Sequence, residues 1–271
     1  MTMKEKLAVC TQQGKALLAV NFYNFETLKG LLLAAKATNS SLILQLSESS
    51  LHYLGIEPAI AMARVMLKEF DVEGWVHLDH GSSIDIIKQC LNAGFDSVMI
   101  DASEKPFDEN VRITKEAVKI ADQYKASVEA ELGYIAKLNQ SQTIEPTSAD
   151  DAKRFVEATG IDALAIAIGN AHGFYKETPR LRLDRLKEIR AVTSCALVLH
   201  GSSGIPDDQL QEAIRCGISK INLATETKNA FMKKLQLLLA DTDEIDLRKI
   251  FPKAIDEVQE LIIKKLNVIN G

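Results

Sequence analysis

The sequence predicts an α/β fold, a single-domain (β/α)8 TIM barrel over residues 1–271 with a C-terminal helical extension. Short apolar runs alternate eight times with longer helical stretches, which is the pattern of parallel strands joined by crossover helices. Eight such units in about 240 residues match the usual size of a closed barrel. No linker rich in proline or serine and no internal repeat divides the chain, so we expect one domain. An open doubly wound sheet is the alternative.

The predicted strands are short runs rich in apolar residues, most of which end in a polar residue. In chain order they are Ala16–Asn21, Leu42–Leu46, Trp75–Asp79, Ser97–Asp101, Ser127–Glu131, Ala163–Ile168, Ala196–His200 and Ser219–Asn222.

Each predicted strand is followed by a helix, and several helices carry signals at their ends. Ser148 is a predicted N-cap, because the acidic residues Asp150 and Asp151 follow it in what would be the first turn, and Gly160 ends that helix. Pro206 opens a later helix and Gly217 ends it. The predicted helices are Phe25–Thr38, Pro58–Phe70, Ile84–Asn92, Phe107–Tyr124, Ser148–Thr159, Leu183–Val192, Asp207–Cys216 and Thr225–Ala240, with Ile245–Asn270 as the extension.

Composition limits the classes of partner. The chain is 46% apolar and 25% charged, and its net charge of −5 removes the electrostatic reason to expect nucleic acid or an anionic membrane. No apolar run approaches the roughly 20 residues that span a bilayer, and Met1–Gly14 lacks a signal-peptide core, so we expect a cytoplasmic protein. The four cysteines lack CxxC spacing, which argues against a disulfide framework or a thiolate zinc site and predicts buried, small apolar side chains (Cys10, Cys90, Cys195 and Cys216).

Polar side chains gather where the predicted strands end. In a parallel barrel these carboxyl ends meet at one mouth, which is where the active site of this fold lies. Three of the five histidines and three carboxylates would face that mouth. The residues at or just past the strand ends are Asn21, Gln45, Ser47, Asp79, His80, Asp101, Glu131, His172, His200 and Asn222.

Three histidines from separate strands suit a catalytic Zn²⁺ with an open fourth position. The candidates are His80, His172 and His200. For any one of them the alternative is a strand cap or a hydrogen bond in the core, but three at matching positions favour the metal. Asp101 and Glu131 are alternative metal ligands, or acceptors that hold the imidazoles.

Asp79 precedes His80 directly and is the candidate proton carrier, because a carboxylate beside a cation keeps a low pKa and can act as a base. Its alternative role is to accept hydrogen bonds from loop amides. His77 lies in the middle of a strand and is expected in the core or behind a ligand, and His52 receives no role.

Two loops are candidates for binding phosphate. Leu199–Pro206 is a Gly/Ser segment after the seventh strand, and Asn222–Thr225 opens the helix after the eighth. Many barrels build a phosphate site at this place from backbone N–H groups. Gly169–Gly173 adds a third glycine-containing segment. A tight turn is the alternative for each loop.

These motifs resemble those of class II, metal-dependent fructose-bisphosphate and tagatose-bisphosphate aldolases. Met99–Ser103 and Asn222–Glu226 are closer to the tagatose-type branch. The resemblance runs through eight segments in family order: Ala19–Asn21, Gln45–Ser47, His77–Gly81, Ser97–Ser103, Glu129–Gly133, Ala165–Gly173, His200–Gly204 and Ile221–Glu226.

The resemblance implies a role for each matching residue. His80, His172 and His200 match the catalytic zinc ligands, Asp79 matches the proton donor and acceptor, and Asp101 and Glu131 match positions that bind a second or displaced metal. The positions expected to bind substrate or to line its pocket are Asn21, Gln45, Ser47, Gly173, Gly201, Ser202, Ser203, Asn222, Leu223, Ala224 and Thr225.

The implied activity is reversible retro-aldol cleavage of fructose or tagatose 1,6-bisphosphate to dihydroxyacetone phosphate and glyceraldehyde 3-phosphate. The implied cofactor is one catalytic Zn²⁺, with a second divalent or a monovalent cation beside it, and the implied assembly is a homodimer or homotetramer. The alternatives are an aldolase of the same family for a singly phosphorylated ketose or keto-acid, a non-catalytic barrel subunit, and an epimerase with the same metal and base.

Two segments depart from the family pattern. After Gly133 a Gly-Gly pair and an acidic loop are replaced by Tyr134–Lys137 and the short connection Leu138–Glu145, which predicts an altered or trimmed lid. In the tail, Ile255–Glu257 stands where an arginine would hold the far phosphate, which leaves Arg248 as the candidate substitute. We therefore expect the chain to depend on one substrate phosphate and to tolerate the absence of the second.

Overall fold

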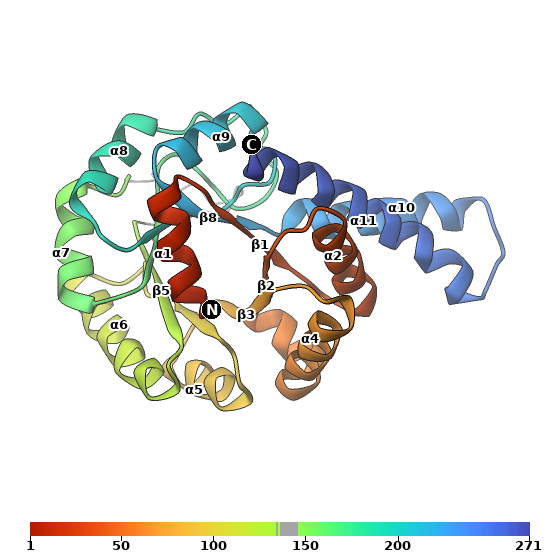
Figure 1. Ribbon diagram of the computed structural model, residues 1–271, viewed down its shortest axis with the longest axis horizontal. Coiled ribbons are helices and arrows are strands. Elements are labelled where there is room, and N and C mark those ends of the chain that lie inside the picture. The colour runs from red at the N-terminus through yellow and green to blue at the C-terminus, as the bar shows by residue number, and fades with distance from the viewer. Residues whose placement is uncertain (134, 136–145) are drawn as a thin grey trace.

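The computed structural model describes residues 1–133, 135 and 146–271. Within this part of the chain, eight parallel strands pair in sequence order and close into a barrel (Figure 1). The predicted barrel is therefore confirmed, and an open doubly wound sheet is excluded. The strands are β1 (Leu17–Asn21), β2 (Leu42–Ser47), β3 (Gly74–Gly81), β4 (Ser97–Ile100), β5 (Ser127–Leu132), β6 (Ala163–Ile166), β7 (Ala196–Leu199) and β8 (Ile218–Leu223).

The predicted helices lie outside the barrel (Figure 1). They are α2 (Phe25–Ala37), α4 (Ile56–Phe70), α5 (Ile84–Ala93), α6 (Phe107–Ala121), α7 (Ala149–Thr159), α8 (Leu183–Val192), α9 (Asp207–Arg215) and α10 (Thr225–Ala240), and a 3-10 turn, η1 (Asp122–Tyr124), follows α6. Ser148 caps α7 by accepting the N–H of Asp151 at 3.0 Å, and Gly160 ends it in the left-handed region.

Strands β6 and β7 end earlier than predicted because side chains take over their last backbone groups. Thr147 Oγ1 accepts the N–H of Ala167 at 2.9 Å, and Asn170 Oδ1 accepts the N–H of Ile168 at 2.8 Å. Asn170 also donates to the carbonyl of His200 at 3.1 Å. The loop after β6 is thus tied to the end of β7.

Two helices in the described part of the chain were not predicted. Helix α1 (Met3–Gln13) lies across the N-terminal end of the barrel (Figure 1) and packs Met3, Leu7 and Cys10 against the interior residues Leu17 and Trp75. Helix α3 (Glu48–Leu54) begins directly after β2, where Ser47 Oγ accepts the N–H of Ser50. All four cysteines are free and buried, as expected.

The inward side chains change from apolar to charged toward the carboxyl ends of the strands. Inward positions repeat every two residues along a strand. The layer of inward side chains next to α1 is apolar and includes Trp75. The next layer contains His77, Glu129 and Lys220. These three are 0% exposed. The next inward positions on the same strands are Asp79, Glu131 and Asn222, at the barrel mouth. Buried charged side chains therefore lie directly below the residues at the barrel mouth.

The predicted extension is α11 (Leu247–Asn270), which packs against α2 and runs beside α10. The outer part of α10 and α11 projects from the barrel as a helical hairpin (Figure 1). Large apolar side chains on or beside this hairpin are exposed, among them Leu237, Ile245 and Leu247. None of the helices in the described part of the chain combines the length and hydropathy needed to cross a bilayer.

Candidate metal centre and active site

A cleft of about 60 Å³ opens at the carboxyl ends of the strands. It brings together eleven side chains and backbone segments, all of them predicted site residues: Asn21, Asp79, His80, His172, Gly173, His200, Gly201, Ser203, Asn222, Ala224 and Thr225.

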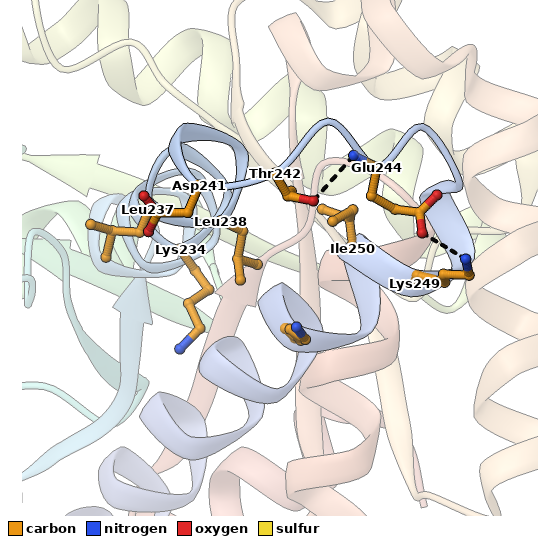
Figure 2. A pocket seen from close by; sticks show the side chains of 9 residues that line it. Lys234, Leu237, Leu238, Asp241, Thr242, Glu244, Lys249 and Ile250 are labelled. Atoms are coloured by element: carbon orange, nitrogen blue, oxygen red, sulfur yellow. Dashed lines mark hydrogen bonds and ion pairs between the residues drawn. The ribbon is translucent and has the colours of Figure 1, made fainter.

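A larger hollow lies between α10 and the start of α11 (Figure 2). There, Glu244 binds Lys249 at 2.6 Å and its N–H is bound by Thr242 Oγ1 at 3.1 Å. The hollow mixes lysines such as Lys234 with leucines such as Leu237. Neither of the two clusters that could hold a metal among the described residues includes any residue of its lining. We therefore place the candidate site at the barrel mouth.

The three predicted histidines converge in the cleft. One nitrogen from each of His80, His172 and His200 lies within 4.8 Å of the other two. The ring centroid of His80 is 5.0 Å from that of His172 and 4.9 Å from that of His200. Burial, followed by the neighbouring imidazoles, lowers the pKa of His172 to about 3, so this ring is neutral, as a metal ligand must be.

A bulge in β3 brings Asp79 and His80 to the same mouth. In a regular strand, adjacent side chains point to opposite faces. Between Leu78 and Gly81 the register with β4 shifts by one residue, and His80 adopts a left-handed backbone with φ of 51°. A bulge can re-aim a side chain in this way, and the left-handed backbone of His80 accompanies it.

The tautomers of His80 and His200 can be assigned from their carboxylate partners. His80 Nδ1 lies 2.7 Å from Asp101 Oδ2, and His200 Nε2 lies 2.8 Å from Glu129 Oε1. An ionised carboxylate only accepts, so both of these ring nitrogens carry a hydrogen. The remaining nitrogens, His80 Nε2 and His200 Nδ1, therefore face each other across 3.1 Å.

Two imidazole nitrogens at this distance share a proton or a cation. Burial lowers the pKa of His80, but Asp79 and Asp101 more than offset it and raise the value to about 9. The ring thus attracts positive charge at this point. Three imidazole nitrogens with this arrangement form a donor set that fits Zn²⁺.

Asp79 lies beside the three histidines, and only one of its two carboxylate oxygens accepts a hydrogen bond from the described residues. Its Oδ2 accepts from Asn21 Nδ2 at 2.9 Å, and Asn21 Oδ1 accepts from Gln45 Nε2 at 3.0 Å. Oδ1 is buried without a hydrogen-bond partner among the described residues and lies 3.9 Å from His80 Nε2. Burial raises the pKa of Asp79, but His80, His200, the hydrogen bond from Asn21 and the charge of Lys220 together lower it below its usual value, so the carboxyl group stays ionised.

A second cluster joins His80 to Asp101 and Glu131, with one ligand atom from each within 4.8 Å of the others. Ser103 donates its hydroxyl to Asp101 at 2.7 Å. Burial, together with the charge of Asp101, raises the pKa of Glu131 to about 8, and one of its oxygens is buried without a partner in the described structure. These oxygens could hold a second cation.

The candidate phosphate loops lie against each other along the cleft. Gly201 has φ of 63°, and a Cβ there would overlap the carbonyl oxygen of Ala171, so only glycine fits. Tyr175 bridges the loops that follow β6 and β7, because its hydroxyl accepts the N–H of Ala171 and donates to the carbonyl of Gly201. Helix α10 starts next to these loops at Thr225.

Four predicted substrate residues lie outside the lining of the cleft. Gln45 is buried behind Asn21, Ser47 caps α3, Ser202 donates to the carbonyl of Asn222 at 2.6 Å, and Leu223 belongs to the apolar core.

The two expected departures from the family have different outcomes. The predicted lid, 134–145, lies outside the described residues except for Ile135. Arg248 is at the outer end of the hairpin, where its side chain is 90% exposed and paired with Asp246. It is thus not part of the cleft of its own chain.

Two residues next to the site, Glu129 and Lys220, received no role from the sequence. Glu129 contacts His200, and Lys220 Nζ binds Glu129 at 2.8 Å. Each lies two residues before a predicted site residue on the same strand, Glu131 and Asn222. A charged residue at an inward position of a buried strand is the signal that could have found both.

Comparison with known proteins identifies the family. A family model described as fructose-bisphosphate aldolase class-II matches residues 1–271. The chain belongs to the class II fructose-bisphosphate aldolase family. A fructose-bisphosphate aldolase from Geobacillus stearothermophilus is 40% identical over 273 residues, which cover 98% of this chain and 95% of the relative.

Solved structures of aldolases share the fold. The YdjI aldolase from Escherichia coli K12 superposes with a TM-score of 0.89 at 34% identity, covering 98% of this chain and 96% of that one. A putative fructose-1,6-bisphosphate aldolase from Coccidioides immitis gives a TM-score of 0.89 at 25% identity, with 99% and 96% covered. As a class II aldolase the chain is an aldehyde-lyase of a metal-dependent family, and His80, His172 and His200 could hold the metal.

Proposed function

We propose that this class II aldolase uses zinc to cleave a ketose bisphosphate, fructose or tagatose 1,6-bisphosphate, reversibly to dihydroxyacetone phosphate and glyceraldehyde 3-phosphate. The observation that carries the proposal is the pair of facing nitrogens His80 Nε2 and His200 Nδ1, 3.1 Å apart, beside Asp79 Oδ1, which has no hydrogen-bond partner among the described residues. The aldolase names of its relatives support the same reaction. A place in the tagatose-type branch remains part of the proposal.

His80, His172 and His200 would hold the zinc ion, which when bound supplies a Lewis acid for the substrate ketone. Asp79 Oδ1 takes the proton of the hydroxyl group next to the breaking carbon–carbon bond, and returns it in the condensation direction. Asn21 holds the other carboxylate oxygen, so Oδ1 keeps a fixed direction. Asp101 and Glu131 would hold the second divalent or the monovalent cation.

The phosphate on the ketone side would bind between the glycine loops and the start of α10. Backbone N–H groups near Gly173, Gly201 and Ser203 border the cleft, and a helix N-terminus favours an anion. None of the described residues that line the cleft is lysine or arginine. The absence of lysine and arginine from the described lining supports the expectation that the enzyme requires only one of the two substrate phosphates.

Fructose 1-phosphate and tagatose 1-phosphate are therefore expected to be cleaved with kcat/KM values within 100-fold of those of the bisphosphates. The measurement is a retro-aldol screen over all four sugars, with dihydroxyacetone phosphate as the readout. A bisphosphate preference of about 100-fold or more corresponds to roughly 2.7 kcal/mol of transition-state binding. Such a preference would contradict the one-phosphate proposal and indicate a cation from residues 134–145 or from a second subunit.

The same screen separates the competing activities. An epimerase with this metal and base would convert the sugar phosphate without releasing a triose phosphate. An aldolase for a keto-acid would act on singly phosphorylated keto-acids, which belong in the panel. A non-catalytic barrel subunit would give no product from any compound. An Asp79 oxygen without a partner among the described residues, beside three converging histidines, argues against a scaffold.

We propose a homodimer or homotetramer as the assembly. The projecting hairpin exposes Leu237, Ile245 and Leu247 by 60% or more, and a second copy of the chain would cover these apolar side chains. Light scattering on the purified protein is expected to give a mass of two or four chains. A monomer at micromolar concentration would contradict this assembly.

A further inference from the structure

Glu129 and Lys220 form an ion pair inside the barrel, directly beneath the three histidines. Lys220 Nζ lies 2.8 Å from Glu129 Oε2, and both side chains are 0% exposed. Removing two charges from water carries a large desolvation cost, which the attraction between them does not always repay. A buried pair of this kind is therefore weak as a device for stability alone, and its other contacts point to a second role.

The carboxylate of Glu129 divides its two oxygens between two partners. Oε2 binds Lys220, and Oε1 lies 2.8 Å from His200 Nε2. His77 cannot replace Lys220 as the partner of Oε2, because its Nε2 is 3.7 Å away and its Nδ1 is 2.9 Å from Ser97 Oγ. Because Lys220 binds Oε2, the other oxygen of Glu129, Oε1, stays available to accept a hydrogen bond from His200.

His200 has two neutral tautomers, and its surroundings offer a partner for each. With hydrogen on Nε2, the ring donates to Glu129 and directs the lone pair of Nδ1 toward His80 Nε2, 3.1 Å away. With hydrogen on Nδ1, the lone pair of Nε2 would accept from Asn222 Nδ2, which lies 3.0 Å away. Only the first tautomer presents a lone pair to the cleft.

We propose that Glu129 and Lys220 are positioning residues that select the Nε2–H tautomer of His200 and so make Nδ1 the metal-binding atom. This inference rests on the proposed zinc site. Glu129 selects the tautomer, because the hydrogen bond that His200 donates to its charged oxygen is stronger than the neutral bond that Asn222 Nδ2 would donate in the other tautomer. Lys220 holds Glu129 in place and balances its charge. Partners that orient a ligand in this way typically contribute 10–100-fold to metal affinity.

The test is the zinc affinity of the metal-free, full-length protein, measured by competition with a chromophoric chelator. Glu129→Gln is expected to weaken zinc binding about 10–100-fold. Ser97→Ala is the matched control, because Ser97 is equally buried and contacts His77 instead of His200. Its zinc affinity is expected to equal that of the wild type.

The double variant Glu129→Gln with Lys220→Met separates positioning from stability. Lys220→Met alone leaves a buried carboxylate unpaired and can prevent folding, whereas the double variant carries no buried charge at either position. If the pair served only stability, the folded double variant would bind zinc as tightly as the wild type. We expect it to fold and still to bind zinc about 10–100-fold more weakly.

Nitrogen NMR of the histidine side chains gives a readout independent of affinity. In the metal-free wild type His200 is expected to carry hydrogen on Nε2, and in Glu129→Gln to shift toward Nδ1. Unchanged zinc affinity in Glu129→Gln, or an unchanged tautomer, would overturn this inference and leave the zinc site intact. Failure of the wild type to bind zinc would instead overturn the proposed function.

Discussion

Replacing Asp79 by alanine is expected to lower the turnover of retro-aldol cleavage by about 10²–10⁴-fold, which is the usual contribution of a general acid–base group. The zinc content is expected to stay at the wild-type level. Asp79 Oδ1 is 3.9 Å from His80 Nε2 and has no hydrogen-bond partner among the described residues, so it is free to move a proton. The measurements are kcat on the best ketose phosphate and elemental analysis of the same sample.

Asp79→Asn is the matched variant, because asparagine has the same shape and can still accept the hydrogen bond from Asn21. Both variants should therefore lose turnover to a similar extent, although only alanine opens a cavity. Normal turnover in Asp79→Asn would remove Asp79 as the proton carrier. Loss of zinc in either variant would instead make Asp79 a metal ligand.

Replacing His172 by alanine is expected to abolish both zinc binding and cleavage. A catalytic zinc site normally has three protein ligands, and loss of an ion worth several kcal/mol in the transition state lowers the rate by about 10³-fold or more. His172 is only partly buried, so the variant is expected to fold. Elemental analysis, kcat and thermal unfolding would be measured together.

His52→Ala provides the control for this experiment. His52 is exposed on α3 and belongs to neither cluster that could hold a metal among the described residues. Zinc content and turnover of His52→Ala should match the wild type. One zinc per chain in His172→Ala would show that this histidine does not bind the ion.

The barrel could be predicted because its signal is local and repeated. A run such as Ser127–Glu131, followed by a capped helix at Ser148, needs no distant residue to define it. Helix α1 could not be predicted in this way. Its apolar residues Met3, Leu7 and Cys10 become a buried face only because the end of the barrel requires a cover.

The position of the site could be predicted from the ends of the strands, but its geometry could not. Adjacent Asp79 and His80 would point apart in a regular strand, and they share the mouth only through the bulge in β3 and the left-handed backbone of His80. Tertiary contacts decide such a conformation. The sequence also does not show that Ser47 caps a helix or that Gln45 lies behind Asn21.

The supporting charges were missed for a related reason. Glu129 lay within a motif that was recognised, and Lys220 lies in a run that was predicted as buried strand. Strand periodicity shows which face each side chain shares, but not that the two meet across the barrel from β5 and β8. Buried charges are normally paired, so two opposite charges at inward positions of the barrel could have been predicted to contact each other.

The most direct test of the zinc aldolase proposal is the retro-aldol activity of metal-stripped protein before and after zinc is added back. Cleavage of every active ketose phosphate is expected to disappear on chelation and to return in full with about one equivalent of zinc per chain, the stoichiometry of a three-histidine site. Full activity in protein shown by elemental analysis to hold no divalent metal would contradict the proposal.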